Sequence, residues 1–197
     1  TGQPRRSTRD VDLLGHGVPS PDRLRQVFRE VCTLAVDDDG VTFLTDAIQA
    51  DQIKEDDEYQ GIRLRIDARL GNVRIPLQVD IGFGDAITPG PNEVTYPTLL
   101  DFPAPKLQVY PRETVVAEKF QAMVQLGTAN SRMKDFYDVW TLARQFEFDG
   151  LGLAAAIRAT FERRQTVLPS TTPMALTSEF STDRGKTIQW NAFLRKG

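Results

Sequence analysis

The chain has 197 residues, of which 40% are hydrophobic and 26% are charged, and its formal net charge at pH 7 is −3. This length allows one large domain or an α/β core followed by a helical second half, and the composition is ordinary for a soluble globular protein. The negative net charge argues against nucleic-acid binding through bulk positive charge, but a local basic patch stays open because phosphate contacts act over about 8 Å.

The cellular compartment is indicated by the absence of secretion and membrane signals. A single cysteine excludes an internal disulfide and is typical of a reducing compartment. No apolar run approaches the roughly 20 residues that span a bilayer, and no signal peptide opens the chain. We therefore expect a cytoplasmic protein with no membrane partner. The chain starts at Thr1 without an initiator methionine, which indicates that it begins partway into a domain.

The first predicted element is a short strand at residues 9–14, where polar and apolar residues alternate. In such a strand Asp10 and Asp12 project from one face, whereas Val11 and Leu13 are expected to enter the core. A helix should follow from Ser20, which precedes a proline and an aspartate as an N-cap residue does, and should run to about residue 36.

A β-hairpin is the clearest local pattern in the chain. Residues 62–70 alternate between apolar and polar, Gly71 and Asn72 form a turn, and residues 73–83 alternate on the way back. Asp80 is out of phase with the apolar series, so its side chain should face away from the core. A further strand is expected at residues 41–44.

The period of the pattern changes from two to about 3.6 after a proline-rich connector at residues 88–111. Gly127 should end the first helix of this half, and Ser131 should cap the second. The expected helices cover residues 112–127, 131–146, 151–163 and 183–196. The predicted fold class is therefore α/β, with a small mixed sheet in residues 1–105 and a helical region in residues 106–197.

Three carboxylates are the strongest candidates for chemistry. Asp10 and Asp12 lie roughly 7 Å apart along one strand face, near enough to share Mg²⁺ ions, and Asp80 lies on a later strand. Two metal ions about 3.5–4 Å apart, held by three carboxylates, would activate an attacking hydroxyl and stabilise a leaving pyrophosphate. The alternative is that Asp10 and Asp12 are solvated residues of an edge strand.

Several motifs occur in an order and spacing that together are fairly specific, and they span most of residues 5–196. They are Arg6-x-Thr8-x-Asp10-x-Asp12-Leu13-Leu14, Tyr59-x-Gly61-x-Arg63, Val79-Asp80-Ile81-Gly82-Phe83-Gly84-Asp85, Tyr110-Pro111-x-Glu113-x-x-x-Ala117-Glu118-Lys119, Asn130-Ser131-Arg132-Met133-Lys134-Asp135-Phe136-Tyr137-Asp138 and Thr160-Phe161-x-x-Arg164-x-Thr166. This set resembles the AbiEii/AbiGii nucleotidyltransferase toxins, a branch of the DNA polymerase β-like superfamily.

The resemblance implies a role for each matching residue. The metal carboxylates and catalytic residues would be Asp10, Asp12 and Asp80. The nucleotide-binding residues would be Thr8, Lys119 and Lys134, with Asp135 or Asp138 near the nucleotide. Arg6 would contact the acceptor or a phosphate. Lys119 would meet the triphosphate as a compact point charge. Each basic residue also has a simpler interpretation as a solvated side chain, and Lys134 and Asp138 are spaced to form an i, i+4 ion pair.

One element of the superfamily pattern is absent from the sequence. Polymerase β-like enzymes carry a Gly-Gly or Gly-Ser turn before the paired carboxylates, where backbone N–H groups hold the triphosphate. Here nine residues precede Asp10 and Gly2 stands alone, which predicts an N-terminally incomplete form of the enzyme.

The function expected from the resemblance is Mg²⁺-dependent transfer of a nucleotide from NTP to an RNA or protein acceptor, with tRNA among the candidates. The expected setting is a toxin–antitoxin or phage-defence system with a cognate antitoxin as partner. Two alternatives remain at this point. One is a metal-dependent nuclease that uses the same carboxylates, and the other is a non-catalytic nucleotidyltransferase-like binding remnant.

Overall fold

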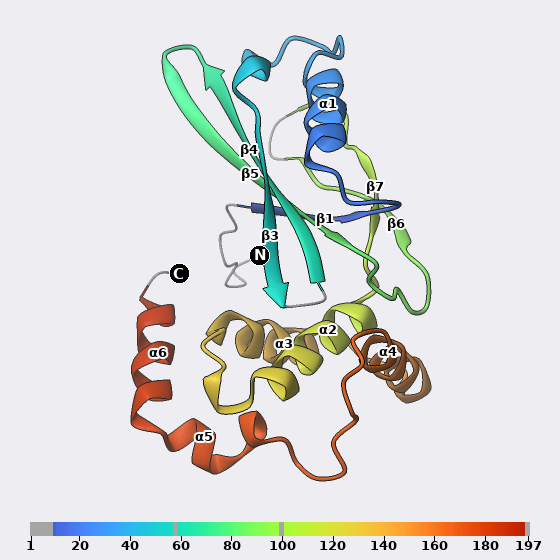
Figure 1. Ribbon diagram of the computed structural model, residues 1–197, viewed down its shortest axis with the longest axis vertical. Helices are drawn as coiled ribbons and strands as arrows, with labels where there is room; N and C mark the ends of the chain where they lie inside the picture. Colours follow the sequence, from blue (N-terminus) through green and yellow to red (C-terminus); the bar gives the residue numbers. More distant parts are fainter. Residues whose placement is uncertain (1–9, 57–58, 99–100, 196–197) are drawn as a thin grey trace. The chain divides into compact units, whose positions relative to one another are not determined.

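The computed structural model describes residues 10–56, 59–98 and 101–195 (Figure 1). The chain divides into two compact units, Thr1–Asp85 and Ala86–Gly197. The α/β class is confirmed, since a mixed sheet forms the first unit and most helices belong to the second. The assignment of domains to residues 1–105 and 106–197 stays a prediction.

A mixed five-stranded sheet is the main element of the first unit. Its strands are β1 (Asp10–Gly15), β2 (Val41–Phe43), β3 (Gln49–Asp56), β4 (Tyr59–Leu70) and β5 (Val73–Phe83). The order is β1-β5-β4-β2, and β3 also pairs with β4. β1 runs parallel to β5, whereas the other pairs are antiparallel. The predicted β4–β5 hairpin is confirmed, and Gly71 in its turn adopts a φ of +56°, a conformation that glycine favours.

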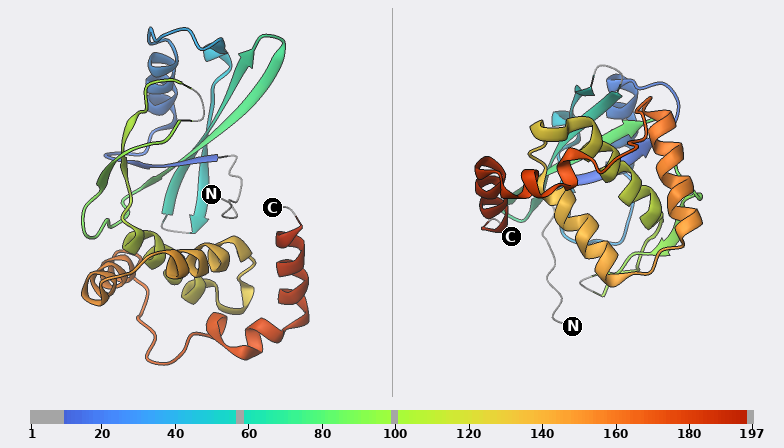
Figure 2. Two further views of the ribbon diagram at one scale, coloured as in Figure 1. Left: turned by 180° about the vertical axis from the view of Figure 1, so that it is seen from behind. Right: turned by 90° about the horizontal axis from the view of Figure 1, so that it is seen from below.

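One helix, α1 (Pro21–Cys32), covers one face of this sheet (Figure 2). It begins as the sequence predicts, because the Ser20 side chain accepts a hydrogen bond from the Arg23 backbone N–H at 3.3 Å. Its apolar side chains pack against the buried residues of β4 and β5 and against Ile48. The residues of this core are Leu24, Phe28, Cys32, Ile48, Leu64, Ile66, Val79 and Ile81.

The expectation that Val11 and Leu13 enter the core is wrong. Val11 is 54% exposed and Leu13 is 44% exposed. Their register opposite Val79 and Ile81 places them on the face that α1 covers. However, β1 is the terminal strand of the described sheet, and the main strand contacts of α1 are with β3. The apolar side chains of β1 therefore stay largely exposed although they lie on the same face of the sheet as α1.

The second unit combines a short hairpin with helices. Its elements are β6 (Asn92–Thr95), β7 (Lys106–Val109), α2 (Arg112–Leu126), α3 (Met133–Gln145), α4 (Gly150–Arg163), α5 (Ser178–Thr182) and α6 (Arg184–Leu194). α2 packs against α3 and α4, and α3 packs against α6. Met123, Met133, Ala175 and Phe180 form its buried core. Within the described ranges, no helix is long and apolar enough to span a bilayer.

The ends of the helices agree with the sequence in one case and differ in another. Gly127 follows α2 with a φ of +49°, as expected for a terminating glycine. Ser131 does not cap α3, which begins at Met133 after Arg132 without a side-chain cap. Instead the Asn130 side chain accepts a hydrogen bond from the Arg132 backbone N–H at 2.8 Å. Asn130 is fully buried, so this bond orders the chain before the helix.

Candidate active site

A polar face of the sheet lies opposite the face that α1 covers. Strand alternation places every second residue of a strand on this face. In the parallel β1–β5 pair, Asp10 lies opposite Gln78 and Asp12 opposite Asp80. In the β4–β5 hairpin, Arg63 is the partner of Asp80. Three neighbouring strands therefore bring carboxylates and a guanidinium group together.

The three predicted carboxylates converge at this point of the sheet. Asp10, Asp12 and Asp80 each offer a carboxylate oxygen, and these oxygens lie within 4.8 Å of one another. Asp10 and Asp80 are half-buried, and Asp12 is exposed. Oxygens that share one Mg²⁺ ion lie at most about 4.2 Å apart, and the upper limit of 4.8 Å in this cluster is slightly wider. The donor set fits a divalent metal ion.

Arg63 is a component of the cluster that the sequence interpretation missed. Its Nε donates to Asp80 Oδ1 at 2.8 Å, and its Nη2 donates to Asp80 Oδ2 at 2.7 Å. The Gln78 side-chain amide also donates to Asp80 Oδ2, at 3.2 Å. The signal was present in the sequence, because a two-residue turn at 71–72 pairs residue 70 with 73 and, counting back along both strands, 63 with 80.

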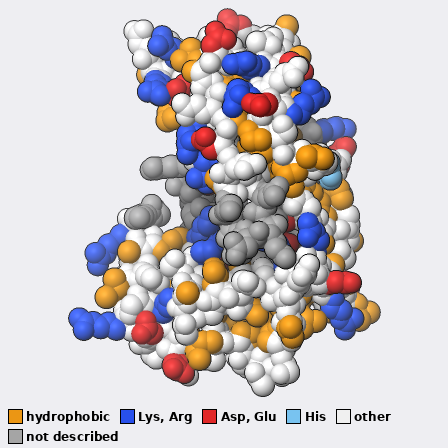
Figure 3. Space-filling view, viewed as in Figure 1, with side chains coloured by type: hydrophobic (Ala, Val, Ile, Leu, Met, Phe, Trp, Pro, Cys, Tyr) orange, Lys and Arg blue, Asp and Glu red, His pale blue; other side chains and the backbone are white. Residues whose placement is uncertain are grey.

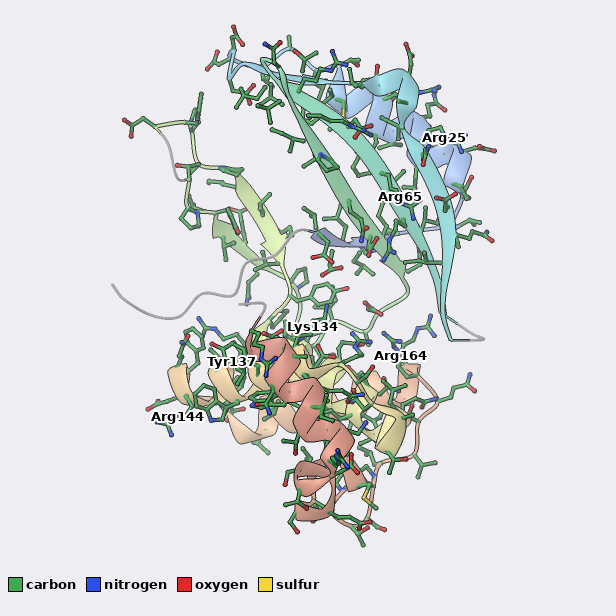
Figure 4. The ribbon with its side chains drawn as sticks, turned by 90° about the vertical axis from the view of Figure 1, so that its left-hand side faces the viewer. Arg25, Arg65, Lys134, Tyr137, Arg144 and Arg164 are labelled. Atoms are coloured by element: carbon green, nitrogen blue, oxygen red, sulfur yellow. The ribbon has the colours of Figure 1, made fainter. Side chains whose placement is uncertain are left out.

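A shallow hollow of about 530 Å³ adjoins Asp10 in the first unit. Arg65, which Figure 4 labels, lines it and pairs with Asp51 at 2.5 Å. Arg74 also lines it and forms a two-bond pair with Asp67, which lowers the pKa of the Asp67 carboxyl and raises the pKa of Arg74. Basic and acidic side chains are likewise intermixed on the face of the first unit seen in Figure 3.

A second ionic cluster connects α2 and α3 in the helical unit. Lys119 Nζ lies 2.6 Å from Asp135 Oδ1 and 3.0 Å from Asp138 Oδ2. The Asp135 side chain is 0% exposed, whereas Asp138 is 22% exposed. Arg132 Nε lies 2.7 Å from Asp135 Oδ2, an ion-pair distance without the alignment of a hydrogen bond. The structure thus brings together three of the residues that the resemblance assigns to the nucleotide.

Lys134 lies apart from this arrangement. It is an exposed residue in the first turn of α3, where Figure 4 labels it. The i, i+4 pairing with Asp138 that its spacing allowed is not observed, because Asp138 pairs with Lys119. Arg6 and Thr8, the remaining predicted site residues, lie outside the described part of the chain.

Two contacts from the end of α4 hold the helix that carries Lys119. Arg164 Nη2 donates to Glu118 Oε2 at 2.7 Å, and both side chains are largely buried. Gln121 Nε2 donates to Thr166 Oγ1 at 2.7 Å. These bonds give a structural role to the Arg164-x-Thr166 motif, whose purpose the sequence interpretation did not identify.

Comparisons with known proteins identify the family of the chain. The crystal structure of JHP933 from Helicobacter pylori matches with 15% sequence identity and a TM-score of 0.46, over 97% of this chain and 77% of that chain, a likeness on which no argument rests. No curated protein matches the chain. The family model described as "Nucleotidyl transferase AbiEii toxin, Type IV TA system" matches residues 1–197, the whole chain. The chain therefore belongs to the AbiEii nucleotidyltransferase toxin family.

Proposed function

We propose that this protein transfers a nucleotide from NTP to an RNA or protein acceptor in a Mg²⁺-dependent reaction. Membership of a nucleotidyltransferase family supports the reaction type. The observation that carries the proposal for this chain is the convergence of Asp10, Asp12 and Asp80, whose oxygens lie within 4.8 Å of one another. Arg63 compensates the charge of Asp80, and carboxylates this close to one another favour the binding of a further cation because like charges repel.

Asp10, Asp12 and Asp80 are the proposed metal ligands and catalytic residues. Mg²⁺ prefers carboxylate oxygens, and when bound it would supply activation of the attacking hydroxyl and charge stabilisation of the leaving pyrophosphate. Asp12 is the most exposed of the three. The neighbouring hollow is lined by Arg65 and Arg74, whose guanidinium groups suit phosphate oxygens of the nucleotide or acceptor.

The helical unit is proposed to contribute Lys119, Lys134 and Asp138 to nucleotide binding, with Asp135 beside them. Their different burial supports different roles. Asp135 is fully buried against Lys119, so we assign it to positioning the lysine. Lys119 and Asp138 keep part of their side chains exposed, and Lys134 is exposed, so these groups can meet a polyphosphate or ribose directly. Thr8 and Arg6 remain proposed contacts of the nucleotide and of the acceptor or a phosphate.

The biological setting belongs to the same proposal. The family description names a type IV toxin–antitoxin system, which supports an antitoxin as partner. We propose phage defence as the context and the cytoplasm as the place of reaction. Among acceptors, tRNA is the first to test, because the resemblance implies modification of its 3′ end.

The decisive experiment measures transfer of label from each α-³²P-NTP to total bacterial RNA or protein in the presence of Mg²⁺. Residues 1–197 are assayed with each of the four nucleotides in parallel. Asp12→Ala should abolish labelling. Asp46→Ala, which removes an exposed carboxylate of the same unit outside the cluster, should not.

Three other outcomes are informative. Release of short RNA fragments without added NTP would favour the nuclease. No label on RNA or protein, with all four nucleotides, would refute the transferase and leave the binding remnant. Label that survives Asp12→Ala would contradict the assignment of the carboxylates.

A further inference from the structure

The contacts of Asp80 restrict how this carboxylate can bind a cation. An ionised carboxylate has two oxygens with about four lone-pair positions. Oδ2 accepts from Arg63 Nη2 at 2.7 Å and from Gln78 Nε2 at 3.2 Å, so both of its positions are used. Oδ1 accepts from Arg63 Nε at 2.8 Å, which uses one of two. Among the described residues, a single acceptor position on Oδ1 is left for a metal ion.

We propose that Arg63 and Gln78 make Asp80 a one-oxygen ligand through Oδ1 and thereby give the site selectivity for Mg²⁺ over Ca²⁺. This inference rests on the metal site of the proposed function. Arg63 acts here as a positioning residue, since it contacts the ligand carboxylate and not the reacting atoms.

The selectivity follows from the coordination that each cation accepts. Mg²⁺ requires nearly ideal octahedral geometry with short bonds, which a carboxylate binding through both oxygens distorts. Ca²⁺ takes six to eight oxygens and accepts carboxylates through one oxygen or two. Because the Arg63 guanidinium group is hydrogen-bonded to both oxygens of Asp80, the carboxylate cannot bind a cation through both oxygens. That mode of binding would favour only the larger cation, Ca²⁺.

The charge of Arg63 has a different effect from its geometry. A nearby positive charge weakens the binding of every divalent cation to a similar extent, because the Coulomb energy depends on charge and distance. The ratio of the two dissociation constants removes this common effect. Arg65 offers a matched control, since it is two residues away on the same face of β4 and pairs with Asp51 instead of Asp80.

The test is isothermal titration calorimetry with MgCl₂ and with CaCl₂, on the wild-type chain and on Arg63→Met, Arg63→Lys, Arg65→Met and Asp80→Asn. Arg63→Met should shift the Mg²⁺/Ca²⁺ preference about tenfold toward Ca²⁺, in the range that supporting contacts of metal ligands produce. Arg63→Lys keeps the positive charge but cannot form two parallel hydrogen bonds to Asp80, so it should shift the ratio of the Mg²⁺ and Ca²⁺ dissociation constants in the same direction. Arg65→Met should change both constants alike.

The outcomes separate this inference from the function on which it rests. If Arg63→Met lowered the dissociation constants for Mg²⁺ and Ca²⁺ equally and left their ratio unchanged, the inference would be overturned. Arg63 would then act only as a competing positive charge. Wild-type binding that is absent, or that Asp80→Asn leaves unaltered, would overturn the proposed metal site and the inference together. Circular dichroism of each variant verifies that the sheet is intact.

Discussion

Replacing Asp135 by asparagine tests the ionic cluster that joins α2 to α3. Asp135→Asn preserves the shape of a side chain that is 0% exposed but removes the charge that faces Lys119 at 2.6 Å. Breaking a fully buried ion pair costs about 3–5 kcal/mol. Here Lys119 is 19% exposed and keeps Asp138 at 3.0 Å, which reduces the loss. We therefore expect the free energy of unfolding to fall by about 2–3 kcal/mol.

Urea titration followed by tryptophan fluorescence measures this loss in the relevant unit, because both tryptophans of the chain, Trp140 and Trp190, belong to the second unit. The Tm should fall by roughly 4–12 °C for a chain of this size. Asp138→Asn is the matched control, since it removes the more exposed partner of the same lysine and should cost about 1 kcal/mol or less. Equal losses in the two variants would refute the assignment of Asp135 as the buried anchor.

Three further predictions concern other parts of the fold. Phe161 is 1% exposed, and its ring centroid lies 5.5 Å from that of Phe120. Phe161→Ala should therefore lower the free energy of unfolding by about 3–5 kcal/mol in the same fluorescence assay. Burial raises the pKa of the Cys32 thiol, so its alkylation rate should rise at higher pH than that of a free cysteine; a profile matching free cysteine would contradict the packing beneath α1. Arg74 lowers the pKa of Asp67, so this pair stabilises the fold above the ordinary carboxyl pKa of about 3.9 and its contribution disappears as pH falls through the lowered value. Carboxyl NMR of Arg74→Ala should show the Asp67 pKa return upward, and no change would rule out the pair in solution.

Local patterns predicted the elements whose boundaries depend on a few adjacent residues. Ser20 starts α1 and Gly127 ends α2 as expected, because capping requires only nearby backbone groups. The β4–β5 hairpin follows from its turn and its alternation. The same register already implied the contact between Arg63 and Asp80, although the sequence interpretation did not draw that conclusion.

Strands without an alternating apolar pattern of their own were not predicted. β3 lies in a polar segment and β7 in the proline-rich connector, and each is a strand because another strand supplies its hydrogen bonds. The exposure of Val11 and Leu13 has a similar cause. Alternation assigns a residue to one face of a strand, but whether that face is covered depends on where a helix from elsewhere packs.

The residues that could take part in chemistry were predictable from the amino-acid pattern. Alternation placed Asp10 and Asp12 on one strand face and turned Asp80 away from the core, since both statements require only the period of a strand. Their convergence depends on the folded sheet, because β1 pairs in parallel with β5 across more than sixty intervening residues. The different burial of Asp135 and Asp138 also depends on the folded structure, because it arises from how α3 packs against its neighbours. The sequence shows only two carboxylates one turn apart on the same helix.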